Sequence, residues 1–119
     1  MPFLCFVFSE DGYMRENKYQ SDLIKKIKKL IPACEILKND AQYKPGIPDL
    51  TVFYGERWVM LEVKVSADAP QQPNQEHYVR VMNDMSYAAF IHPDNEAEVL
   101  REVQRALGIG RATRVSKSK

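Results

Sequence analysis

The sequence predicts a single α/β domain, because a segment with helical periodicity precedes several strand-like segments and the two patterns then alternate. Apolar residues recur at helical spacing within 15–31, whereas 49–65 is rich in the β-branched and aromatic side chains that strands favour. A chain of 119 residues can build one hydrophobic core. We expect the domain to span 1–107, with an apolar extension at 1–13 and a basic tail at 108–119.

The N-terminal part of the chain predicts one main helix. We interpret the apolar run 3–8 as a short strand or a segment lying on the domain, and 9–12 as a turn. The helix is expected from Arg15 to Ile31, and Pro32 ends it. Its core-facing stripe consists of Leu23, Ile24, Ile27, Leu30 and Ile31.

Three strands are expected next, at 35–37, 49–53 and 58–65, and the last of these carries the apolar run of a strand covered on both faces. A second helix follows, with Asn74 as its N-cap. Its apolar face comprises Tyr78, Val81, Met82 and Met85.

A fourth strand is expected at 88–92, followed by a third helix. Asp94 or Asn95 caps the start of this helix, and Gly108 is a natural C-terminal cap.

Composition and charge exclude several classes of protein. Hydrophobic content of 45% and charged content of 28% are those of an ordinary globular domain. The formal net charge of the chain is +1. Four basic residues and no acid follow Leu107, so residues 1–107 carry a net charge of −3. Cys5 and Cys34 are far apart and have no zinc-ligand spacing, which favours buried thiols in a reducing compartment. With no signal-peptide pattern or membrane span, we expect a cytoplasmic protein and no membrane partner.

The strand at 58–65 contains the pattern that suggests chemistry. Glu62 and Lys64 are two residues apart and therefore share a face of a strand that is otherwise apolar. Burying both charges is costly unless they pair with each other or bind a metal. An internal ion pair is the simpler explanation.

Asp49 favours a site over a simple ion pair. A short turn between neighbouring antiparallel strands should bring Asp49, at the start of one strand, beside Glu62, near the end of the next. Two carboxylates without a nearby histidine or thiol suit Mg²⁺ or Mn²⁺, and an adjacent lysine completes a constellation for phosphoester hydrolysis. Glu16 projects within about 20° of Leu23 and Ile27 on the first helix, so it should point toward the sheet.

The segments Gly46-Ile47-Pro48-Asp49-Leu50 and Leu61-Glu62-Val63-Lys64 resemble the signature of the PD-(D/E)XK nuclease superfamily, most like its small VRR-NUC, Holliday-junction resolvase and phage endonuclease I domains. The resemblance implies a restriction-endonuclease-like αβββαβ core, with a mixed central sheet flanked by helices and an extra C-terminal helix. It also implies Asp49, Glu62 and the Val63 carbonyl as metal ligands, and Lys64 as the catalytic lysine.

The resemblance extends to assisting residues. Glu16 lies where the superfamily places an additional acidic residue, as a second-metal or water-linked ligand. Gln75 matches a glutamine that VRR-NUC-like members carry, and we favour it over Gln71 and Gln72 because it lies inside the helix. Candidate nucleic-acid contacts are Lys38, Tyr43 and Lys44 in a loop, and Arg111 and Arg114 in the tail, although these residues could equally be solvated.

The function expected on this basis is Mg²⁺-dependent cleavage of DNA phosphodiesters, with Mn²⁺ able to substitute. Small members act on branched DNA such as Holliday junctions or flaps, in many cases as homodimers, and the source would be a phage or a bacterium. The alternatives are a restriction- or repair-type endonuclease on ordinary duplex, and a non-catalytic nucleic-acid-binding module that keeps the fold.

Overall fold

The computed structural model describes the backbone of residues 2–109 and the side chains of residues 14–109. Its elements follow the order α1 (Pro2–Leu30), β1 (Glu35–Lys38), β2 (Leu50–Tyr54), β3 (Arg57–Val63), α2 (Pro73–Met85), β4 (Tyr87–Ile91) and α3 (Glu96–Ala106). The four strands form one sheet in the order β1-β2-β3-β4. The prediction of an α/β domain with a mixed sheet is therefore confirmed.

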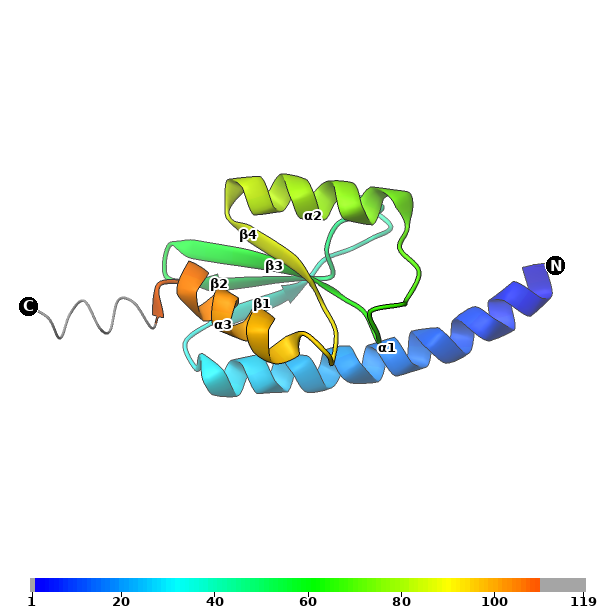
Figure 1. Cartoon of the computed structure of the whole chain (residues 1–119), viewed down its shortest axis with the longest axis horizontal. Coiled ribbons are helices and arrows are strands. Elements are labelled where there is room, and N and C mark those ends of the chain that lie inside the picture. The colour runs from blue at the N-terminus through cyan, green and yellow to red at the C-terminus, as the bar shows by residue number, and fades with distance from the viewer. Residues whose placement is uncertain (1, 110–119) are drawn as a thin grey trace, which may run out of the picture.

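The direction of each strand follows from the connection that precedes it. β1, β2 and β3 are antiparallel neighbours, and a tight turn at Gly55, with φ +62°, joins β2 to β3. β4 is parallel to β3, so the chain needs a crossover between them, and α2 supplies it. Figure 1 shows α2 on one face of the sheet and α1 and α3 on the other.

The main hydrophobic core lies between the sheet and the α1–α3 layer. Alternate residues of the central strands point into it, since side chains alternate between the two faces of a strand. Its best-buried members are Leu23, Ile27 and Ile31 of α1 and the segment after it, Leu50, Val52, Val59, Leu61, Val63 and Ile91 of the sheet, and Val99, Leu100 and Val103 of α3. Helix α2 has no fully buried residue and covers the other face with half-buried side chains.

The predicted strand at 3–8 and turn at 9–12 are wrong, because α1 runs without a break from Pro2 to Leu30. Proline is well tolerated in the first turn of a helix, and a short apolar run does not distinguish strand from helix by its periodicity. Gly12 within the helix costs only about 1 kcal/mol relative to alanine. Residues 2–13 are thus part of α1. No helix within residues 2–109 is long and apolar enough to span a bilayer.

Smaller corrections concern element ends and faces. Helix α2 begins with Gln72 as its N-cap, not Asn74, because Pro73 occupies the first helical position, where its missing N–H is no loss. Leu30 was expected in the core but is 43% exposed, and Met85 of α2 is 62% exposed. Strand β3 ends at Val63, two residues earlier than expected. Asn95 is the N-cap of α3, and Gly108 follows that helix with a positive φ, as predicted.

Two residues of α1 offer a matched test of the core. Ile27 is fully buried in the core, whereas Leu30, of similar size and on the same helix, is 43% exposed. Ile27→Ala should lower the free energy of unfolding by about 2–5 kcal/mol, because it leaves a cavity. Leu30→Ala should lower it by less than about 1 kcal/mol. Urea denaturation measures both values, and equal losses would contradict the packing of Ile27 in the core.

Candidate functional site

The register of the β2–β3 hairpin places Asp49 and Glu62 opposite each other. Leu50 pairs with Leu61, so the next residues outward along the two strands are Asp49 and Glu62. Opposite residues of an antiparallel pair point to the same face. Since Leu61 belongs to the α1–α3 core, Glu62, the next residue of β3, points to the side of α2, where Gln75 bonds to it.

Three carboxylates meet at this end of the sheet. Glu16 of α1, Asp49 and Glu62 each offer one oxygen, and these three oxygens lie within 4.8 Å of one another. Glu62 is only 1% exposed, and its Oε1 is buried without a hydrogen-bond partner. The backbone N–H of Val63 donates to Asp49 Oδ2 at 2.8 Å, which fixes the Asp49 carboxylate against β3. The structure thus brings together all three acidic residues that the sequence predicted for the site.

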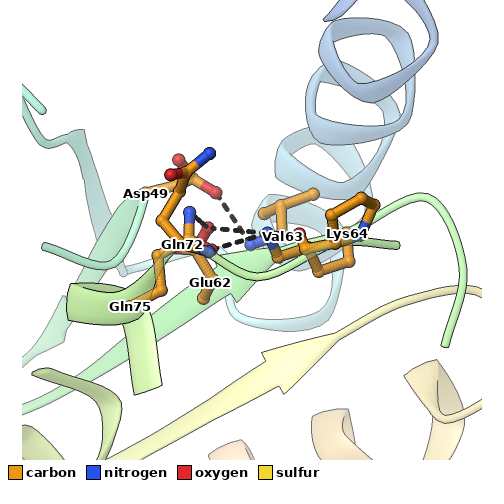
Figure 2. Close-up of polar contacts among 7 residues, drawn as sticks. Asp49, Glu62, Val63, Lys64, Gln72 and Gln75 are labelled. Atoms are coloured by element: carbon orange, nitrogen blue, oxygen red, sulfur yellow. Dashed lines mark hydrogen bonds and ion pairs between the residues drawn. The ribbon is translucent and has the colours of Figure 1, made fainter. Parts of the chain in front are cut away.

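Lys64 and Gln75 form a hydrogen-bonded network beside the carboxylates (Figure 2). The Gln75 amide of α2 donates from Nε2 to Glu62 Oε2 at 2.8 Å and accepts at Oε1 from the Lys64 ammonium at 2.7 Å. Lys64 Nζ also donates to the carbonyl of Pro70 and lies 3.8 Å from Glu62 Oε2. The N–H of Gln72 donates to Gln75 Oε1. Gln75, and not Gln71 or Gln72, is therefore the glutamine whose side chain reaches both the acid and the lysine.

Burial raises the pKa of each of the three carboxyl groups, and a neighbouring carboxylate raises it further for Glu62 and Glu16. Burial raises the pKa of Glu62 to about 9, with the charge of Asp49 as the next cause. Burial also raises the pKa of Asp49, although the Val63 N–H opposes the shift. The pKa of Glu16 is raised by burial and by Asp49. The lysine lowers all three values but does not offset the excess of negative charge.

These three carboxylates are the described residues that could hold a cation. They form an all-oxygen donor set, which hard divalent cations such as Mg²⁺ and Mn²⁺ prefer. The unpartnered Glu62 Oε1 fits such a role, because a buried carboxylate oxygen otherwise requires a donor.

A groove of about 330 Å³ opens beside the network, between the loop 39–49 and the first turn of α2. Its lining residues are Ala41, Pro45, Gly46, Gln72, Pro73, Asn74 and Gln75. Gly46 has φ +94°, and a Cβ there would lie 2.3 Å from the Cβ of Asn74. Only glycine therefore lets the loop that leads to Asp49 approach α2 this closely.

The other residues predicted for nucleic-acid contact lie in or beside the loop 39–49, or outside the residues that the structure describes. Lys38 ends β1 and is exposed, and Tyr43 is 84% exposed. The Lys44 ammonium lies 5.3 Å from the centre of the Tyr78 ring on α2. Their contact with nucleic acid stays a prediction, as does the ligand role of the Val63 carbonyl. Arg111 and Arg114 lie outside the described residues.

Two groups that hold the site were not predicted from the sequence. The carbonyl of Pro70 accepts from Lys64, and a backbone carbonyl carries no sequence signal. The side chain of Asn39 bonds to the segment that carries Asp49. No local pattern signals these bonds either, since they join Asn39 to residues nine and twelve positions further along the chain.

Comparison with known proteins found no matching family model, no matching curated protein and no matching solved structure. What the site does has to be inferred from its own residues.

The close approach at Gly46 yields a test with an internal control. Gly46→Ala should destabilise the protein more than Gly55→Ala, because both glycines have positive φ but only the first Cβ meets another chain segment. The difference should be about 1–3 kcal/mol, the usual cost of overpacking. Urea denaturation of both variants measures it. Equal destabilisation would show that the loop does not press on α2.

The raised pKa of Glu62 predicts how stability depends on pH. Between its ordinary value of 4.5 and about 9, folded protein without a cation retains a proton that the unfolded chain releases, so the free energy of unfolding falls as pH rises through this window. Glu62→Gln keeps the size but cannot ionise, and it should flatten the fall. The exposed Glu56→Gln is the control. Urea titrations in EDTA from pH 5 to about 9.5 measure the slopes, and a wild-type slope in Glu62→Gln would contradict the assignment.

Proposed function

We propose that this chain is a divalent-cation-dependent endonuclease that hydrolyses DNA phosphodiesters. The observation that carries the proposal is the meeting of Asp49, Glu62 and Glu16 with the buried Lys64 at one end of the β2–β3 hairpin. Acids that hold a divalent cation, with a cationic donor beside them, can support metal-assisted phosphoester hydrolysis.

The order of elements supports a restriction-endonuclease-like arrangement. A helix, three antiparallel strands, a crossover helix and a fourth strand parallel to the third are consistent with the αβββαβ core that the sequence resemblance implies. The candidate acids lie at the start of β2 and near the end of β3, where the superfamily pattern locates them. Helix α3 would then be the extra C-terminal element.

The cation proposed for the site is Mg²⁺, with Mn²⁺ as a substitute. Three carboxylates face one ammonium, so a bound divalent cation would offset the remaining negative charge and allow the acids to ionise at neutral pH. Asp49, Glu62 and Glu16 would hold it. Such a cation supplies charge stabilisation on the phosphate and lowers the pKa of water.

Lys64 and Gln75 have distinct roles in the proposal. Lys64 is 7% exposed, and Nζ donates to two neutral oxygens, which hold its side chain close to the acids. It can donate to a non-bridging phosphate oxygen or orient the attacking water. Gln75 holds Glu62 and Lys64 at a fixed separation, because its two amide atoms bond to one each.

The proposed substrate is branched DNA, cut by a homodimer. The support is the sequence resemblance, together with an exposed aromatic and basic residues (Tyr43, Lys38 and Lys44) in and beside the loop that lines the groove. An exposed aromatic ring with two lysines near it suits contact with backbone phosphates and with unstacked bases. Ordinary duplex remains the alternative substrate.

A second candidate function has one observation in its favour. Lys64 Nζ already makes two hydrogen bonds and a weak ion pair within the protein, as a purely structural lysine would. The chain would then be a nucleic-acid-binding module in which Glu62 and Lys64 stabilise the fold. Metal-independent binding without cleavage would follow from it.

Cleavage assays on Lys64→Ala test the proposal. The variant should cleave at least about 100-fold more slowly than wild type on a four-way junction, a flap or a duplex, because the ammonium beside the acids is lost. DNA binding by gel shift should change little. Lys18→Ala, on the exposed face of α1, should cleave at the wild-type rate.

Omission of the cation provides the complementary test. Wild type in EDTA should not cleave any substrate, and Asp49→Asn should need more Mg²⁺ than wild type for half-maximal rate. If wild type with Mg²⁺ or Mn²⁺ nicks none of the three substrates but binds them in EDTA, the binding module is the correct function and the nuclease proposal fails.

A further inference from the structure

Asn39, which follows β1, makes three hydrogen bonds to the short segment around Asp49. Its backbone N–H donates to the Asp49 carbonyl at 2.8 Å. Its side-chain Nδ2 donates to the Pro48 carbonyl at 2.8 Å and to Thr51 Oγ1 at 2.9 Å. All three bonds therefore reach residues within two positions of the acid.

The backbone bond extends the sheet by one rung beyond the regular strands. Lys38 pairs with Leu50, so Asn39 is the residue opposite Asp49, just as Glu62 is opposite Asp49 on the other side. Asn39, Asp49 and Glu62 thus lie side by side across the sheet, with Asp49 in the middle. Its backbone is fixed by Asn39, and its carboxylate accepts from the Val63 N–H at 2.8 Å.

The side-chain bonds add a constraint that the ladder alone does not provide. Pro48 has no N–H, and the segment before it is an irregular loop, so nothing regular holds the chain as it enters β2. One amide group ties the carbonyl before Asp49 to a buried hydroxyl after it, since Thr51 is almost fully buried. This clamp limits rotation of the backbone that carries the acid.

We infer that Asn39 is a positioning residue, which orients Asp49 for cation binding without touching the cation or the substrate. This inference rests on the proposed function for its consequence. Asn39 carries no charge, so its loss changes where the Asp49 carboxylate lies and not the charge of the site. Residues that orient a ligand in this way commonly contribute a factor of 10–100 to metal affinity.

The test is Mn²⁺ binding, followed by the electron paramagnetic resonance of free Mn²⁺, in wild type, Asn39→Ala and Thr51→Val. Asn39→Ala should raise the dissociation constant on the order of tenfold or more. Thr51→Val removes one of the two acceptors and should raise it less. It also keeps the inference testable if Asn39→Ala does not fold. The matched control is Asn83→Ala, which loses a side-chain bond to the Ala88 N–H at the α2–β4 junction and should bind Mn²⁺ like wild type.

Thermal unfolding of each variant separates positioning from general stability. The inference requires a loss of Mn²⁺ affinity in Asn39→Ala that Asn83→Ala does not show at a comparable loss of stability. Wild-type affinity in Asn39→Ala and Thr51→Val, or an equal loss in Asn83→Ala, overturns the inference and leaves the proposed function standing. Absence of Mn²⁺ binding in wild type itself would overturn the proposed function, and the cation role of Asn39 with it.

Discussion

The accumulation of negative charge at one end of the sheet is the constraint on which the rest of the structure depends. Glu16, Asp49 and Glu62 place three carboxylates within 4.8 Å, against the single ammonium of Lys64. Burial of these charges costs free energy. The raised pKa values of Glu62 and Asp49 reflect this cost, because a protonated carboxyl group carries no charge. A fold selected for stability alone would replace such a cluster with apolar residues.

The surrounding elements hold this cluster from three directions. The β2–β3 register aligns Asp49 with Glu62, α1 contributes Glu16, and α2 contributes the Gln75 amide that bridges Glu62 and Lys64. The connection between β3 and β4 contains α2. This crossover makes β4 parallel to β3, and it also brings Gln75 of α2 to the site. The groove beside α2 lies next to this cluster and shares Gln75 with it.

Local sequence patterns were sufficient to predict most of the fold and the acids of the site. Where these predictions failed, the failure has a physical cause. Asp49 and Glu62 could be predicted to converge because hairpin geometry depends only on the length of the turn. Glu16 could be placed because helical spacing fixes its direction relative to Leu23 and Ile27. The strand predicted at 3–8 was wrong because six apolar residues fit a helix and a strand equally well. The prediction that Leu30 lies in the core was wrong because periodicity gives the direction of a side chain but not where the covering sheet ends.

The sequence by itself determined the α/β class, the order of the strands and helices after residue 15, and which carboxylates share a face. These properties follow from periodicity and from turn and cap residues, which act over a few positions. Only the tertiary structure decided that Gln75 bonds to both Glu62 and Lys64, that Pro70 accepts from the lysine, and that Asn39 clamps the backbone around Asp49. Each of these contacts joins elements through a loop whose path no local pattern specifies, because it is set by how the whole sheet and its helices pack.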